Sequence, residues 1–82
     1  MDVDVDSGLR SIIARHMKIK DQDLINDDSR FIEDLDADLL DIIFIINDAE
    51  DEFRIRINGE SEDFCTVGDL SREIKNTIAG QR

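Results

Sequence analysis

One short apolar block limits the possible folds of this chain more than any other feature. Seven of the eight residues from Leu39 to Ile46 are apolar, and they lie inside a segment, residues 31–53, that holds nine acidic residues and no basic one. Asp41 interrupts the block, which is far too short to cross a bilayer. We therefore interpret it as part of a folded domain rather than as a membrane span.

A helix over residues 39–52 accounts for this block best. Asp38 precedes it as a suitable N-cap, and Asp41 follows three residues later, where the positive end of a helix favours an acid. The acids that follow the block also suit a helical surface. The β-branched residues leave a strand open as the alternative, because periodicity alone does not separate the two.

Two further helices are predicted on either side of this one. The first has Ser7 as its N-cap, and a long polar loop over Lys20–Arg30 follows it. Its apolar residues recur at the helical spacing: Leu9, Ile12, Ile13 and Met17. The last helix starts at a pair that resembles a capping box, Thr66 with Asp69, and ends at Gly80. Its stripe consists of Val67, Leu70, Ile74 and Ile78. Residues 53–57 alternate like a short strand that turns at 58–59.

The charge balance and the cysteine content narrow the partners and the compartment. The chain has 21 acidic and 10 basic residues, a net charge of −11. Nucleic acid and anionic membranes are disfavoured, because both are bound by Lys/Arg surfaces, whereas basic protein surfaces are suitable partners. A single cysteine, Cys65, and the absence of a signal-like stretch at Met1–Asp6 predict a cytoplasmic protein. With 40% hydrophobic residues, we expect one folded domain over residues 1–82.

No set of residues makes a convincing metal or catalytic site. A calcium loop that starts at Asp34 would need glycine and glutamate where Leu39 and Ile45 stand, so we interpret these acids as a solvated helix start. His16 has no nucleophile paired with it, and Cys65 is predicted to be a small core residue. We therefore expect neither a metal ion nor enzymatic activity.

The middle helix carries too many apolar residues for one small core. At about 100° per residue, its apolar side chains span an arc of roughly 260°. Leu39, Ile42 and Phe44 therefore do not all point inward, and we expect an exposed apolar face with an acidic rim. The acids that fall together in the gap of the arc are Asp41, Asp48 and Glu52. The alternative is an irregular helix that its neighbours wrap almost completely.

Residues 31–41 read F-I-E-D-L-D-A-D-L-L-D, and residues 50–53 read E-D-E-F. These segments resemble the acyl carrier protein family, whose pattern is F-x-E-D-L-G-A-D-S-L-D followed by an acidic recognition helix that ends in E-E-E-F. The resemblance covers most of the chain. The first and last predicted helices are also similar to those of the family. The resemblance implies an all-α, four-helix bundle with three longer helices and a short third helix near residues 59–65, in place of a strand over 53–57.

Four positions depart from the family pattern. Leu39 stands where the family has the serine that forms the phosphodiester to 4'-phosphopantetheine. Asp36 replaces a glycine, Phe44 replaces a glutamate that meets basic partner surfaces, and Asn47 replaces an apolar contact residue. The resemblance therefore implies that this chain, as sequenced, carries no such cofactor at Leu39.

The leading hypothesis is a non-enzymatic carrier-like protein that acts as a protein-interaction module linked to fatty-acid or polyketide synthesis. Its partners would be basic surfaces of synthase or transferase type enzymes, or a second copy through the same helix. The predicted contact residues are Asp38, Leu39, Asp41, Ile42, Phe44, Asp48 and Glu52. We expect a core without an acyl pocket, which a large cavity lined by Ile43, Ile46, Ile57 and Phe64 would contradict. The alternative is a genuine carrier in which Leu39 was introduced to block modification.

Overall fold

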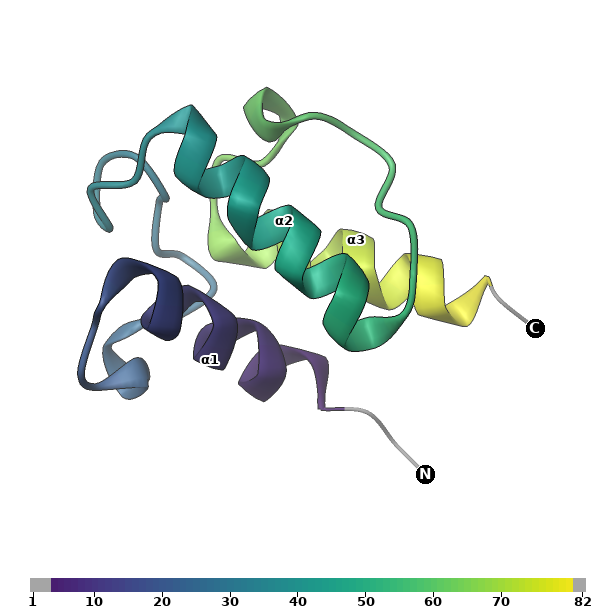
Figure 1. Ribbon diagram of the computed structural model, residues 1–82, viewed down its shortest axis with the longest axis horizontal. Coiled ribbons are helices and arrows are strands. Elements are labelled where there is room, and N and C mark those ends of the chain that lie inside the picture. Colours follow the sequence, from purple (N-terminus) through teal and green to yellow (C-terminus); the bar gives the residue numbers. More distant parts are fainter. Residues whose placement is uncertain (1–3, 81–82) are drawn as a thin grey trace.

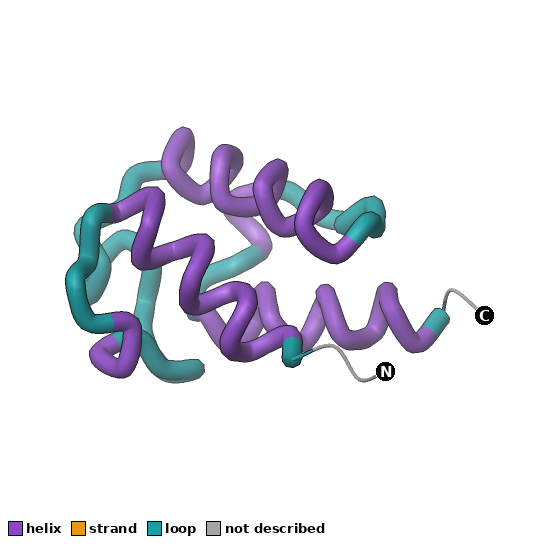
Figure 2. Tube along the Cα trace, turned by 60° about the horizontal axis from the view of Figure 1, so that its bottom comes forward, coloured by secondary structure: helices purple, strands orange, loops and turns teal. Residues whose placement is uncertain are grey.

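Three helices form the framework of the molecule (Figure 1). The computed structural model describes residues 4–80, so the two ends of the predicted 1–82 domain, including Met1–Val3 of the stretch considered for a signal peptide, lie outside the described residues. The helices are α1 (Val5–Met17), α2 (Leu39–Phe53) and α3 (Val67–Ala79). Two 3-10 turns complete the described secondary structure: η1 (Gln22–Leu24) and η2 (Ser61–Asp63). Figure 2 shows helices joined by loops, with no strand in the described chain, and this confirms the all-α class.

Capping boxes fix the starts of α2 and α3. The backbone N–H of Asp41 donates to Oδ1 of Asp38 (2.9 Å), and the N–H of Asp38 donates back to Oδ2 of Asp41 (3.0 Å). Thr66 and Asp69 make the same reciprocal pair at the start of α3. Each box satisfies two backbone donors that a helix start leaves without a partner. Both predicted helix starts are confirmed.

The start of α1 differs from the prediction. Its N-cap is Asp4, whose Oδ1 accepts the N–H of Ser7 at 3.0 Å, so Ser7 lies inside the first turn and is not the cap. The earlier start adds the buried Val5 to the apolar face of the helix. Aspartate caps a helix as well as serine does, and this extra burial favours the longer helix.

The predicted strand over residues 53–57 does not form. Arg54 ends α2 in the left-handed conformation (φ 54°), and Ile55 and Ile57 then point into the core while their neighbours face solvent. The alternating pattern therefore reflects which side chains are buried against the helices, and no strand pairs with this segment in the described chain. The short third helix expected near residues 59–65 is a single 3-10 turn, η2.

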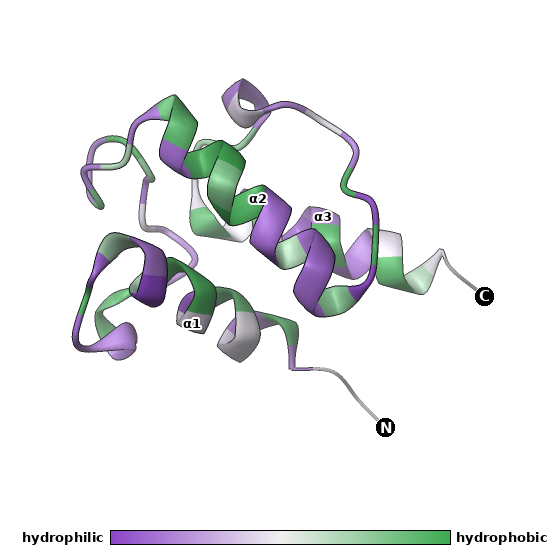
Figure 3. Ribbon diagram, viewed as in Figure 1, coloured by the Kyte–Doolittle hydropathy of each residue, from purple (hydrophilic) through white to green (hydrophobic). Residues whose placement is uncertain are grey.

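The core lies between the three helices and takes in side chains from both long loops. Phe31 and Ile25 enter it from the first loop, and Ile57 and Phe64 enter it from the second. Figure 3 shows that the first half of α2 is largely hydrophobic and its second half largely hydrophilic. Cys65 is exposed, so the prediction that it is a core residue is wrong. The backbone is extended around it, and Phe64, whose side chain points the other way, fills the core instead.

Candidate functional site

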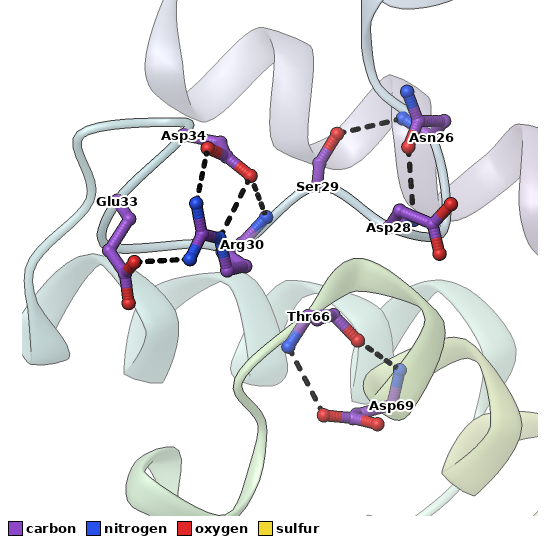
Figure 4. Close-up of polar contacts among 8 residues, drawn as sticks. All are labelled: Asn26, Asp28, Ser29, Arg30, Glu33, Asp34, Thr66 and Asp69. Carbon is purple, nitrogen blue, oxygen red and sulfur yellow. Dashed lines mark hydrogen bonds and ion pairs between the residues drawn. The ribbon is translucent and has the colours of Figure 1, made fainter.

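The loop before α2 is fastened to the start of α3. The N–H of Phe31 donates to the carbonyl of Cys65 (3.0 Å), and the N–H of Val67 donates to the carbonyl of Ser29 (2.9 Å). Figure 4 shows the side chain of Arg30 held by Asp34 and Glu33. Asp34, considered above for a calcium loop, is thus engaged in an ion pair. These contacts fix the position from which α2 starts.

Leu39 is the first residue of α2, and its side chain is exposed. It follows the N-cap Asp38, and Asp36 lies two residues before that cap, with the left-handed backbone conformation (φ 58°) that favours glycine. The side chain of Leu39 is a hydrocarbon, so it offers no oxygen, nitrogen or sulfur atom to a phosphate group. Any chemistry at this helix start must come from its neighbours.

Asp41 joins the start of α2 to the end of α1. Its Oδ1 lies 3.2 Å from Nε2 of His16, and the His16 ring lies 5.7 Å from the ring of Phe44. The pKa of Asp41 lies below its ordinary value, chiefly because the backbone N–H of Asp38 donates to its carboxylate, and also because of His16. Asp41 is therefore held in place as an anion, in the first turn of the helix.

α2 has two apolar faces. The inner face consists of Ile42, Ile45, Ile46 and Ala49, all of them buried. The outer face, which we call the outer apolar stripe, consists of Leu39, Leu40, Ile43 and Phe44. The exposed fraction is 57% for Leu40 and 47% for Phe44. An exposed apolar face is therefore present, as the sequence predicted.

Ile42 is not part of that exposed face. Only 1% of its surface is exposed, so the prediction that it contacts a partner is wrong. Its neighbour Ile43 is exposed in its place, because one residue along a helix turns the side chain by about 100°. Of the predicted acids, Asp41 is half-buried, and the others are exposed: Asp38, Asp48 and Glu52.

A groove of about 360 Å³ runs beside α2, between this helix and residues 57–62. Its apolar lining comes from Ile43, Ile46 and Ile57. The glutamates that line it are Glu50, Glu60 and Glu62. The expectation of a core without a pocket is therefore corrected: three of the four residues named for such a cavity line an open groove. Gly59, on its far wall, has φ 120°, a backbone conformation that side chains other than hydrogen rarely allow.

The fourth named residue, Phe64, lines a separate hollow of about 100 Å³ next to Leu39. The exposed Cys65 lines this hollow too. The thiol thus lies near the start of α2 but on another segment of the chain.

The sequence reasoning missed three features of this site: the exposure of Leu40 and Ile43, the groove, and the contact between His16 and Asp41. The exposure of Leu40 and Ile43 could have been predicted from the sequence, because the inner face of α2 occupies positions 42, 45, 46 and 49 and leaves positions 40, 43 and 44 facing outward. The other two depend on how distant segments pack, which no local pattern encodes.

In the described part of the chain, no helix has the length and apolarity that a membrane crossing needs. Within the same residues, 4–80, no group of three or more His, Cys, Asp or Glu side chains is placed to hold a metal ion.

The fold and this site define a small helical domain that is organised around one exposed helix. No family model matches the chain. The chain is 44% identical over 70 residues to an acyl carrier protein of Borreliella burgdorferi. The aligned region covers 84% of this chain and 86% of that protein. Acyl carrier proteins of Lactobacillus acidophilus and Wolinella succinogenes are 38% and 31% identical, over 83% and 82% of the chain and 85% and 88% of their own lengths. The chain belongs to the acyl carrier protein family.

Proposed function

We propose that this chain is a member of the family that is not loaded at the usual position and that acts, without catalysis of its own, by binding a partner protein through α2. The observation that carries the proposal is Leu39 at the first position of α2, directly after the motif that the chain shares with the family. A phosphodiester to 4'-phosphopantetheine requires a hydroxyl group, and leucine has none. The residues at this position do not fit that group.

No nearby residue is a clear substitute for the missing serine. α2 contains no serine, and Ser29 and Ser61 are buried. The Ser61 hydroxyl, moreover, donates to Glu62 at 3.1 Å. Cys65 is exposed but lies just before α3, outside the helix that presents the family motif.

What remains is a surface suited to docking. The outer apolar stripe provides area that gains free energy when it leaves water, and Asp48 and Glu52 attract a basic partner. The family resemblance points to synthase or transferase type enzymes of fatty-acid or polyketide synthesis as the class of partner.

One observation favours the alternative, a genuine carrier whose serine has been replaced. The groove lined by Ile43, Ile46 and Ile57 is apolar enough to shelter an aliphatic chain. Under this reading, the surface that a phosphopantetheinyl transferase recognises is intact, and only the hydroxyl is missing.

Restoring the hydroxyl separates the two functions. The wild-type chain, Leu39→Ser and the matched control Leu40→Ser are incubated with a phosphopantetheinyl transferase and coenzyme A, and each intact mass is measured. Our proposal predicts that none of the three gains mass, although circular dichroism shows all three folded. Loading of Leu39→Ser, but not of Leu40→Ser, would instead establish the alternative.

A further inference from the structure

Asn58 and Gly59 form a short link between two fixed points of the second long loop. On one side, the N–H of Ile57 donates to Oε2 of Glu50 at 2.8 Å, which ties the loop to α2. On the other side, the N–H of Glu60 donates to a carboxylate of η2 at 2.9 Å. Asn58 and Gly59 belong to no helix or strand, and both are exposed. Water and hydroxide ion therefore reach this pair directly.

The backbone N–H of Gly59 is available for chemistry. Within residues 4–80 it donates to no hydrogen-bond acceptor, and the side-chain amide of Asn58 makes no hydrogen bond there either. Gly59 has no Cβ to shield its nitrogen, and the wide conformational range of glycine lets that nitrogen turn toward the side chain before it. The nitrogen of Gly59 can therefore reach the carboxamide carbon of Asn58 and close a five-membered ring.

The other three asparagines of the chain lack this combination. Asn47 and Asn76 lie inside α2 and α3, where the N–H of the following residue takes part in the helical hydrogen bonds. Such an N–H becomes available only when the helix opens locally. Asn26 precedes an aspartate, and its Oδ1 already accepts the N–H of Asp28 at 3.0 Å (Figure 4). Asn58 is therefore the asparagine that is best placed to react.

We propose that Asn58–Gly59 is a site of spontaneous covalent modification, at which Asn58 deamidates. The nitrogen of Gly59 gives its proton to water or hydroxide and attacks the carboxamide carbon of Asn58. A new C–N bond forms, the C–NH2 bond breaks, and the leaving nitrogen takes up a proton and departs as ammonia. One water molecule then opens the resulting succinimide at either of its two carbonyl carbons. The products are aspartate and isoaspartate, and no group is oxidised or reduced.

The modification changes one wall of the groove, because Gly59 lines the groove together with Glu60 and Glu62. Either product adds one negative charge beside these glutamates. Isoaspartate also adds one methylene group to the main chain between the two fixed points, which displaces Gly59. We therefore expect the isoaspartate form to shift the amide signals of residues 57–62 more than the variant Asn58→Asp, which adds only the charge.

The test is a timed incubation of the full folded chain at mildly alkaline pH, where the amide nitrogen gives up its proton more readily. Samples are digested briefly at acidic pH, and the mass of each peptide shows whether an NH group has been exchanged for an oxygen atom. Labelling by an isoaspartyl methyltransferase with a radioactive methyl donor detects isoaspartate. We expect Asn58 to be modified at least about tenfold faster than any other asparagine.

Asn58→Gln is the diagnostic variant, and Asn76→Gln is its matched control, because both side chains are exposed. The longer glutamine side chain must close a larger ring, which forms slowly. We expect Asn58→Gln to lose most of the modification and most of the methyltransferase labelling. Asn76→Gln should keep both, and circular dichroism checks that each variant is folded.

The same chain unfolded in guanidinium gives the rate at Asn58 without the fold. Modification of Asn58 in the unfolded chain alone would show that the fold protects this pair and would overturn the proposal. A rate at Asn58 in the folded chain no higher than that at the other asparagines would overturn it as well. Neither outcome depends on Leu39, so this test is separate from that of the proposed function.

Discussion

Asp36 is one of three residues other than glycine that have a positive φ in the described chain. It adopts φ 58°, where an L-residue other than glycine is strained and aspartate is only better tolerated than most. We predict that Asp36→Gly raises the free energy of unfolding, by up to about 1 kcal/mol. Asp28→Gly is the control, because its φ is not positive and glycine there only adds entropy to the unfolded chain. Urea denaturation gives both values, and equal losses in the two variants would contradict strain at Asp36.

Asp6 links α1 to α3 through its carboxylate. The hydroxyl of Ser71 donates to it at 2.6 Å, and Nζ of Lys75 donates at 3.0 Å. These two contacts, the first more than the second, hold the pKa of Asp6 below its ordinary value. A lowered folded-state pKa means that the stabilisation is present above the unfolded pKa, about 3.9, and is lost as the pH falls through the folded pKa.

We therefore predict that Asp6→Asn loses less stability than the wild type between about pH 5 and pH 2.5. Some acid sensitivity persists in the variant, because Asp34 and Asp41 also have lowered pKa values. Urea denaturation across this pH range provides the measurement. Stability curves of wild type and variant that run parallel would show that the contacts of Asp6 contribute nothing that depends on pH.

At the scale of the element, α2 depends on its capping box. Asp38→Ala leaves the N–H of Asp41 without its acceptor, and we predict a loss of about 1 kcal/mol in the free energy of unfolding. Asp48→Ala, at an exposed position in the middle of the same helix, should change it by less than about 0.5 kcal/mol. Guanidinium denaturation compares the two variants. A loss for Asp48→Ala as large as that for Asp38→Ala would point to general charge effects rather than to the cap.

Structural features whose contacts lie close together in the sequence were predictable. The Asp38–Asp41 and Thr66–Asp69 boxes close within three residues, so sequence alone identified both helix starts. The start of α1 was misplaced because Asp4 and Ser7 are both good caps, and the burial of Val5 decides between them. Residues 53–57 alternate as a strand does, but a strand also needs a partner, and the described chain offers none.

The candidate site was predictable only in outline. An excess of apolar residues on α2 correctly indicated an exposed face, but Ile42 was exchanged for Ile43, an error of one position on the helix. The groove was missed because it depends on where Gly59 and η2 lie against α2, and loop placement follows from packing over the whole molecule. Cys65 was misplaced for the same reason.

At the scale of the whole molecule, charge and apolar surface are arranged around the same helix. The net charge of −11 is spread over the chain, but residues 31–53 contain nine acids and no base, and the outer apolar stripe lies among these acids. A net charge of this size opposes contact between two copies, and we propose that the stripe meets a partner of opposite charge. The start of α2 carries Leu39 at the position where, by resemblance, we propose that the family has its serine.

The most direct test of this account is the intact mass of Leu39→Ser after incubation with a phosphopantetheinyl transferase and coenzyme A. We predict that the folded variant keeps its original mass, because in the function we propose the exposed Leu40, Ile43 and Phe44 of α2 serve a different partner. A gain equal to one phosphopantetheine group, absent from Leu40→Ser, would contradict the account and identify the chain as a carrier that lacks only its hydroxyl.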